Sequence, residues 1–408
     1  MRTRYRPSSR SPEFRWFAGA QAVSMIGNAM TNTALYWLGI HLADGHALGL
    51  SVLAAAQFLP MLFLSRRAGL LAEQHRPGRV LAFTTMAECA GALAIGVPLA
   101  AGWMTIWYLW VLGFGIGCAQ ALGQAAGQMF MLDLVGRADL RRGASVSSMV
   151  TGLSKIAGPG LAGFMIATVG GGPVFLTDAA SFAGVIAILL WLTQTTAPAT
   201  SRTEAPATTA RRLRWVLQLP RGIQLVAAMA LLIGGFGYQF EITNPLIATR
   251  VFHLSAEAFG LLGTLMAIGG IAGSYYSSRR PNPRGSEFAV WSLVFGIAEC
   301  VAAVMPAPWA YEIVMVVIGA TITLFAITAT VYIRQAAPPA QLGQSLSAYN
   351  AAFIGFVPAG AFAVAAIATL AGTRWALIGP GLVVAIFAAA ILGLMRRIEE
   401  PRTRPGRA

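Results

Sequence analysis

Charged side chains are scarce in this sequence: 11% of its 408 residues are Asp, Glu, Lys or Arg, whereas 56% are hydrophobic and the mean hydropathy is +0.65. A soluble domain carries about 25% charged residues, so this composition excludes a water-soluble globular fold. The 45 glycines and 21 prolines lie among apolar runs, and small residues let membrane helices pack closely. The composition therefore predicts an all-α integral membrane protein.

The sequence also lacks the patterns of enzymes, metal centres and ATP-driven pumps. It has neither a Cys/His metal-ligand spacing nor a nucleophile paired with a base, and the phosphate-binding pattern Gly-x-x-x-x-Gly-Lys-Ser/Thr is missing. The formal charge of +14 is not gathered in a basic nucleic-acid-binding module. We therefore expect no enzyme activity, cofactor, metal or nucleic-acid partner. The few reactive side chains lie in expected loops or apolar runs: His41, His46, His75, His253, Cys89, Cys118 and Cys300.

Long apolar runs predict twelve membrane-spanning helices, because about 20 apolar residues are needed to cross ~30 Å of hydrocarbon. A polar stretch rich in Thr and Pro, residues 195–221, separates the sixth run from the seventh and predicts a cytoplasmic linker between two six-helix halves. The expected spans are 16–40, 48–66, 80–101, 104–131, 143–168, 172–194, 223–248, 256–277, 288–305, 309–333, 344–369 and 375–395.

These spans divide the chain into a basic cytoplasmic N-terminus (1–15), an N-terminal bundle (16–194), the linker (195–221), a C-terminal bundle (222–396) and a cytoplasmic tail (397–408). Two short matches, with one shared sequence offset, support a repeat of the six-helix unit. They pair Ala-Leu-Gly-Leu at 47–50 with Ala-Phe-Gly-Leu at 258–261, and Ala-Glu-Cys at 87–89 with Ala-Glu-Cys at 298–300.

The distribution of basic residues predicts the orientation in the membrane. All of them but one are arginines, and all arginines except Arg250 and Arg374 fall in segments on one side of the predicted spans. Because basic residues favour the cytoplasmic side, we expect both termini in the cytoplasm and a multi-pass protein of a bacterial inner membrane. The strong basicity is thus a topology signal.

Twelve spans, a duplicated half and a long middle loop resemble the major facilitator superfamily. The loop at 69–79, Gly-Leu-Leu-Ala-Glu-Gln-His-Arg-Pro-Gly-Arg, is similar to the superfamily signature Gly-x-Leu-Ala-Asp-Arg-x-Gly-Arg-Arg. Three stretches most resemble the branch that contains the enterobactin exporter and related drug and siderophore exporters. They are Leu-Val-Gly-Arg-Ala-Asp-Leu at 134–140, Lys-Ile-Ala-Gly-Pro-Gly-Leu-Ala-Gly at 155–163 and Asn-Pro-Leu-Ile-Ala-Thr-Arg-Val-Phe at 244–252.

The sequence departs from that branch at several positions. Asn28 stands where the branch usually has Asp, Gly127 lies near its usual fourth-span Arg, and Leu-Gly-Gln at 342–344 replaces an Arg-Gly-Arg motif. The resemblance implies a monomeric, proton-coupled secondary active exporter of a small organic molecule, with a siderophore as the favoured substrate. A multidrug or antibiotic exporter is the alternative. Two less favoured alternatives are a non-transporting receptor or scaffold and an intramembrane enzyme.

Uncharged polar residues recur every four positions in two spans, so each set shares one helical face. Because unsatisfied amides do not face lipid, these faces must point inward. They predict either a substrate-lining path or hydrogen bonds between helices. The residues are Asn28, Asn32 and Tyr36 in the first span, and Gln120, Gln124 and Gln128 in the fourth.

Ionisable residues inside spans are costly, so each is a functional candidate. Lys155, in the middle of the fifth span, is predicted either to bind an anionic substrate or to pair with a carboxylate such as Glu88. Tyr238 and Glu241 share a face of the seventh span, which resembles a cavity-lining helix, and Glu241 is predicted to carry the coupling proton. Its alternative is an ordinary, water-exposed carboxylate near the outer mouth. Structural pairing is favoured for Glu88, Asp178 and Glu299.

The loop after the second span predicts a cytoplasmic gate. Gly69, which has no Cβ, is expected to allow close approach of a neighbouring helix, and Glu73 can pair with an arginine or cap a helix. Arg76 and Arg79 can complement helix C-termini. The alternative is that the loop only anchors the protein to lipid headgroups.

Overall fold

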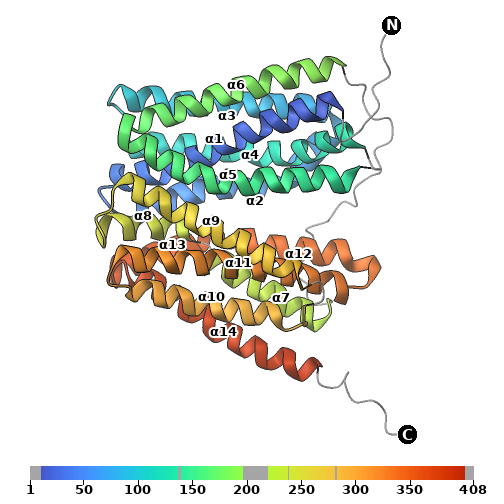
Figure 1. The fold of residues 1–408 in the computed structure, drawn as a ribbon, viewed down its shortest axis with the longest axis vertical. Helices are drawn as coiled ribbons and strands as arrows, with labels where there is room; N and C mark the ends of the chain where they lie inside the picture. The colour runs from blue at the N-terminus through green and yellow to red at the C-terminus, as the bar shows by residue number, and fades with distance from the viewer. Residues whose placement is uncertain (1–10, 137–138, 196–218, 238, 281–282, 400–408) are drawn as a thin grey trace. The chain divides into compact units, whose positions relative to one another are not determined.

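The computed structural model describes residues 11–136, 139–195, 219–237, 239–280 and 283–399. Throughout these residues the secondary structure is helical, without strands (Figure 1). Helices cover all twelve predicted spans, and most of their ends lie within a few residues of the predicted ones, although α2 continues to Gln74. The predicted linker at 195–221 lies largely outside the described residues.

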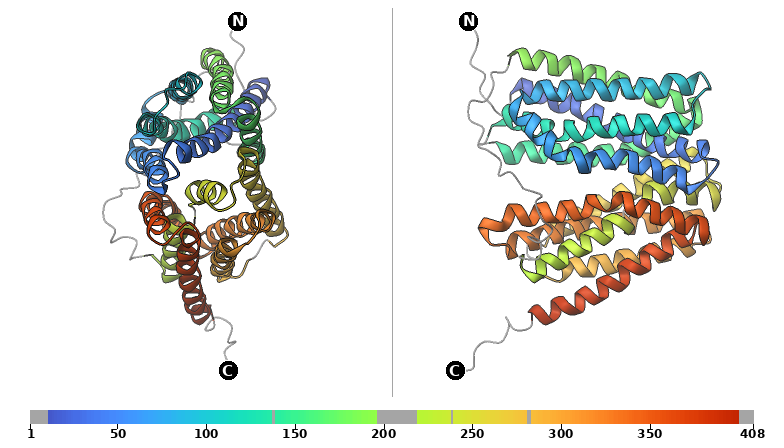
Figure 2. Two further views of the ribbon diagram at one scale, coloured as in Figure 1. Left: turned by 90° about the vertical axis from the view of Figure 1, so that its left-hand side faces the viewer. Right: turned by 180° about the vertical axis from the view of Figure 1, so that it is seen from behind.

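The first six spans are single long helices, drawn from blue to green in Figure 1 and lying side by side in both views of Figure 2. Helix α1 packs against α5 and α6, and α3 packs against α4 and α6. Their bounds are α1 Pro12–Leu42, α2 Ala47–Gln74, α3 Pro77–Ala100, α4 Ile106–Val135, α5 Leu140–Val169 and α6 Gly171–Thr195.

Two of the last six spans are broken helices. The seventh consists of α7 (Arg221–Leu232), a π-helical turn η2 (Ile233–Gly237) and α8 (Phe240–Arg250), and the eleventh of α12 (Leu342–Gly355) and α13 (Val357–Leu370). The two breaks pack against each other, and a Cβ added at Gly235 or Gly360 would clash with the opposite span. The other elements are α9 Ala256–Ser278, α10 Glu287–Val304, α11 Pro308–Ala336, η3 Pro339–Gln341 and α14 Trp375–Glu399.

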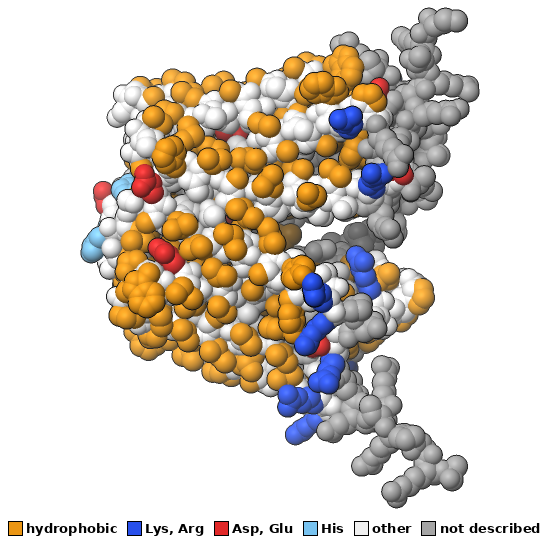
Figure 3. Space-filling view, viewed as in Figure 1, with side chains coloured by type: hydrophobic (Ala, Val, Ile, Leu, Met, Phe, Trp, Pro, Cys, Tyr) orange, Lys and Arg blue, Asp and Glu red, His pale blue; other side chains and the backbone are white. Residues whose placement is uncertain are grey.

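The surface of the helices suits a lipid environment. Eleven stretches are long and apolar enough to cross a membrane, and hydrophobic side chains cover much of the visible face (Figure 3). Exposed tryptophans lie near helix ends, as in the aromatic belts of membrane proteins: Trp16, Trp103, Trp107, Trp309 and Trp375. Helix α1 is not among these eleven stretches, and some of its polar side chains, such as Ser24 and Thr31, are buried.

The chain divides into two compact units. One comprises Met1–Gly45, Val52–Ala205 and Leu254–Thr264, and the other comprises His46–Ser51, Pro206–His253 and Leu265–Ala408. The same contact recurs in both units at the repeated Ala-Glu-Cys. The Cys89 thiol on α3 donates a hydrogen bond to the Ala179 carbonyl on α6 (3.4 Å), and the Cys300 thiol on α10 donates to the Ile378 carbonyl on α14 (3.7 Å). The repeat thus marks equivalent helix pairs.

Candidate functional site

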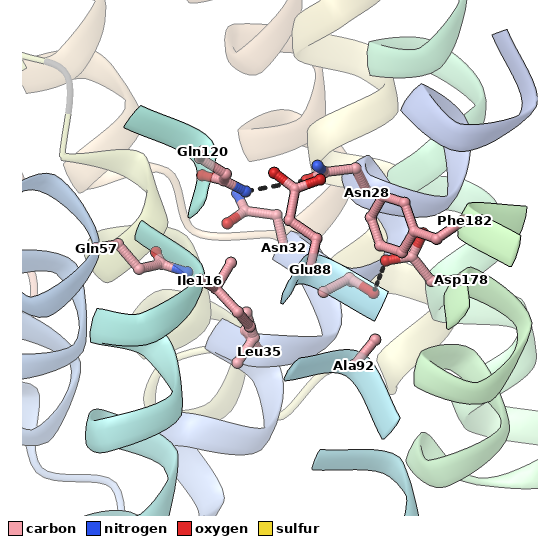
Figure 4. Close-up of a pocket in the computed structure, with 11 residues that line it drawn as sticks. Asn28, Asn32, Leu35, Gln57, Glu88, Ala92, Ile116, Gln120, Asp178 and Phe182 are labelled. Carbon is pink, nitrogen blue, oxygen red and sulfur yellow. Dashed lines mark hydrogen bonds between the residues drawn. The ribbon is translucent and has the colours of Figure 1, made fainter. Parts of the chain in front are cut away.

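A polar pocket lies inside the first unit, between α1, α2, α3, α4 and α6 (Figure 4). Its polar side chains are two acids, from α3 and α6, together with hydroxyl and amide groups from α1, α2 and α4. The lining residues are Asn28, Thr31, Asn32, Leu35, Gln57, Glu88, Ala92, Ile116, Gln120, Asp178 and Phe182.

Asp178 is the most buried acid of the pocket, with 1% of its surface exposed. Two hydroxyl groups lie within hydrogen-bond distance of its carboxylate. Thr31 Oγ1 donates to Oδ2 at 2.7 Å, and Ser181 Oγ lies 3.2 Å from Oδ1. Gly27 makes room for this arrangement, because a Cβ at that position would fall on Asp178 Oδ1 and close to Ser181 Oγ. Hydroxyl donors stabilise the charged form of a buried carboxyl group, so these two contacts offset part of the cost of burying Asp178.

Glu88 is the second acid, and its surroundings differ. It is half-buried on α3, and its carboxyl group points toward the amides of Asn28 and Gln120 (Figure 4). It lies close enough to Asp178 for the two carboxyl groups to interact electrostatically. None of the residues that line the pocket donates a hydrogen bond to Glu88. Since two neighbouring carboxylates repel each other when both are ionised, Glu88 is the member of the pair better suited to bind a proton.

The amide side chains bring the polar faces of the first and fourth spans together. Gln120 Nε2 on α4 donates to Asn28 Oδ1 on α1 at 3.4 Å, a long hydrogen bond. Tyr36, one turn beyond Asn32, is buried and donates its hydroxyl to Gln57 Oε1 at 2.8 Å. Tyr36 therefore holds α1 to α2 and does not line the pocket.

The pocket is small. Its volume is about 10 Å³, which is room for about one water molecule. An organic substrate does not fit, whereas a proton carried by a carboxyl group or by one water does. The geometry thus supports ion chemistry at this place in the bundle.

Comparison with known proteins identifies the family. A family profile described as "transmembrane secretion effector", one of the major facilitator families, matches residues 4–404. The chain belongs to the major facilitator superfamily. Its relatives and structural neighbours are transporters, so this major facilitator protein is a multi-pass membrane transporter of small molecules and is not an enzyme.

Individual relatives of this transporter are distant. It is 25% identical over 292 residues to the uncharacterized MFS-type transporter YfiS of Bacillus subtilis, covering 68% of this chain and 67% of that one. It is 24% identical over 294 residues to the staphyloferrin A transporter of Staphylococcus aureus, covering 70% and 72%. Its fold is similar to that of a bacterial homolog of the human lysosomal transporter Spinster (TM-score 0.72, 12% identity, 98% and 100% covered). A POT peptide transporter is similar too (TM-score 0.75, 12% identity, 96% and 97% covered).

Several residues predicted for the substrate or proton path of the transporter lie apart from the pocket. Gln124, one turn beyond Gln120, is exposed, and so is Lys155 in the middle of α5. Lys155 therefore does not contribute to the surroundings of Glu88 in the pocket. Glu241 is half-buried in the first turn of α8 in the other unit. Tyr238 lies outside the described residues.

The loop predicted as a gate has an unexpected structure at its glycine. Among the described residues of its own unit, a Cβ added at Gly69 would meet no atom within 4 Å, and no close helix approach is seen there. In α5 such an approach does occur, at Gly158, whose position leaves no room for a Cβ beside Ala29 of α1. Arg76 and Arg79 are exposed at the start of α3, and the side chain of Glu73 is not among those described.

Sequence analysis also missed Thr31, Ser181, Gly27 and Gln57. A single hydroxyl residue or glycine in an apolar span does not recur at a regular spacing, so the sequence gives no sign that it belongs to a site. Gln57 stood alone in the second span, and its isolation among apolar residues was the one available signal.

Proposed function

We propose that this transporter is a proton-coupled secondary active exporter of the bacterial inner membrane, with both termini in the cytoplasm. The polar pocket carries the proposal, because it joins two carboxyl groups inside a membrane-spanning bundle. A charge at membrane depth costs at least ~2.5–3.5 kcal/mol on insertion scales, so an acid retained there without a function is hard to explain.

The two acids have different roles in proton binding: Asp178 stays ionised and Glu88 binds the proton. Asp178 keeps a negative charge with the help of Thr31 and Ser181, and this charge favours proton binding by Glu88. Protonation of Glu88 removes the repulsion within the pair and changes its interaction with the amides of Asn28 and Gln120. Because Asn28 and Gln120 connect α1 and α4, proton binding can alter the packing of these two helices.

A siderophore or similar secreted metabolite is the favoured substrate. The support is the distant relationship to a staphyloferrin A transporter and the resemblance to siderophore exporters, which also favours export over import. The substrate must bind outside the polar pocket, which is too small for it. Lys155, exposed midway along α5, is the proposed contact for an anionic or oxygen-rich group. Multidrug export is the second candidate.

Purified protein in liposomes with an imposed pH gradient provides the test, with efflux of a staphyloferrin-type siderophore as the readout. Glu88→Gln keeps the size of the side chain and removes its titration, so it should leave siderophore binding measurable and abolish the response to the gradient. Asp178→Asn should weaken the same response. Glu257→Gln, the same change at an exposed glutamate, is the matched control and should behave like wild type.

Glu241, the proton carrier predicted from the sequence, is the competing proposal. Glu241→Gln in the same assay separates the two assignments, because the variant that loses its response to the gradient identifies the coupling carboxyl group. An unchanged response in both Glu88→Gln and Asp178→Asn would refute the role of the pocket. A protein that moves neither siderophores nor drugs would instead support the receptor alternative.

A further inference from the structure

The second unit contains a buried acid that the proposed mechanism does not use. Glu299, on α10, is 2% exposed, and its Oε2 atom is buried without a hydrogen-bond partner. It occupies the position equivalent to Glu88 in the repeated Ala-Glu-Cys, since each following cysteine contacts the paired helix in the same way. A buried carboxylate without donors is far more costly than a neutral carboxylic acid.

Two side chains near Glu299, those of Tyr311 and Cys300, donate their hydrogen bonds to other acceptors. Tyr311, on α11, is fully buried and near enough to interact electrostatically with Glu299. Its hydroxyl donates its one proton to Asn244 Oδ1 at 2.8 Å, so toward Glu299 its oxygen can only accept. Cys300 donates its proton to the Ile378 carbonyl.

The helices around Glu299 carry few charged side chains, and on α11 Glu312 directly follows Tyr311. Helix α14 carries no titratable side chain between Trp375 and Met395. Arg221 at the start of α7 is the titratable residue of α7 and η2. Arg374, before α14, donates to the Ala303 carbonyl at 3.2 Å, one turn of α10 beyond Glu299. These contacts therefore give Glu299 no counter-charge among the described residues.

Two glycines hold α10 and α14 in backbone contact beside Glu299. A Cβ added at Gly296 would lie 2.6 Å from the Gly381 carbonyl oxygen, and one added at Gly381 would lie 2.9 Å from Glu299 Cβ and from Cys300 Sγ. This α10–α14 crossing thus packs against the base of the Glu299 side chain, and a separation of the two helices would open the surroundings of Glu299 to water.

We propose that Glu299 is a second proton-binding site, which holds a proton while the α10–α14 crossing is closed and releases it when the crossing opens. The binding part stands on the geometry of this unit alone. Only the use of the released proton in transport rests on the proposed function.

Infrared spectroscopy of the full-length protein in lipid tests the binding part without any substrate. A protonated carboxyl group gives a carbonyl stretching band that a carboxylate lacks. We expect this band for Glu299 at neutral pH, identified as the band that Glu299→Gln removes. Glu287→Gln, a glutamate change at the exposed start of the same helix, where Oε1 accepts from the Arg284 amide at 3.1 Å, should leave the band unchanged. Absence of a Glu299 band at neutral pH would overturn the proposal.

A second pair of variants tests the role of the crossing. Gly381→Ala places a Cβ against Glu299 and Cys300 and should separate the helices, so the Glu299 band should disappear at a lower pH than in wild type. Gly393→Ala makes the same change on the same helix where a Cβ would meet nothing within 4 Å, and should titrate like wild type. Equal titration of the two alanine variants would overturn the proposed control of proton release. The readout does not depend on export, so a failure here is distinct from a failure of the transport proposal.

Discussion

Replacing Thr31 with valine removes one hydroxyl donor of Asp178 while keeping the shape of the side chain. The hydrogen bond is short, 2.7 Å between Thr31 Oγ1 and Asp178 Oδ2, and both residues are buried. A hydrogen bond to a charged group contributes about 1.5–3 kcal/mol, and one between neutral groups about 0.5–1.5 kcal/mol. If Asp178 is ionised, Thr31→Val should lower the free energy of unfolding by an amount in the higher range.

The same substitution in an Asp178→Asn background separates the two cases. The amide oxygen can still accept from Thr31 but carries no charge, so Thr31→Val should then cost only about 0.5–1.5 kcal/mol. The assay is reversible unfolding of purified protein in mixed micelles at neutral pH. Thr33→Val is the matched control, because the Thr33 hydroxyl donates to the Ala29 carbonyl of its own helix at 3.0 Å. Its cost should be the same in both backgrounds.

Equal costs of Thr31→Val in the two backgrounds would refute the reasoning, since Asp178 would then be neutral. The proposal that Asp178 stays ionised while Glu88 binds the proton would then be refuted as well. Ser181→Ala should cost less than Thr31→Val, because the Ser181 hydroxyl has a closer acceptor in the Asp178 carbonyl, at 2.7 Å, than in the carboxylate.

Three further predictions concern packing, the gate and topology. Gly27→Ala should reduce the amount of folded protein in membranes, because its Cβ meets Asp178 and Ser181, whereas Gly19→Ala, with nothing within 4 Å, should not; equal amounts of the two would contradict the packing. Gly69→Leu should leave folded protein unchanged, and a transport assay then decides the loop's role, because lost flux supports a gate and normal flux reduces the loop to a lipid anchor. Reporter fusions at Pro198 and the C-terminus should report cytoplasm and one at Gly171 the outside; a cytoplasmic signal at Gly171 would overturn the predicted orientation.

Most of the spans were predictable because hydropathy and length indicate whether a helix can cross a bilayer. The breaks at Ile233–Gly237 and after Gly355 were not, since they depend on packing between spans far apart in sequence. The same holds for the site. The spacing of Asn28 and Gln120 placed them on inward faces, and the structure joins them by a hydrogen bond. Which acids share that pocket depends on how α3 and α6 pack, and the sequence favoured a structural role for Glu88 and Asp178.

The approach expected at Gly69 illustrates the limit of reading a glycine from sequence. A missing Cβ permits close contact but does not require it, and only the neighbouring helix decides. Gly27 and Gly158 make the contact in this structure and Gly69 does not. Tyr36 shows the same limit for a polar stripe, because its hydroxyl reaches Gln57 on α2.

The polar character of α1 has a consequence for how the protein is made. This helix leaves the ribosome before the others, yet it is the span too polar to qualify as a membrane segment by composition. Its partners α5 and α6 are synthesised only after α2, α3 and α4, and Asp178, the acceptor for Thr31, is part of α6. Stable integration of α1 should therefore wait for the end of the first half, which makes the order of synthesis part of how this pocket is assembled.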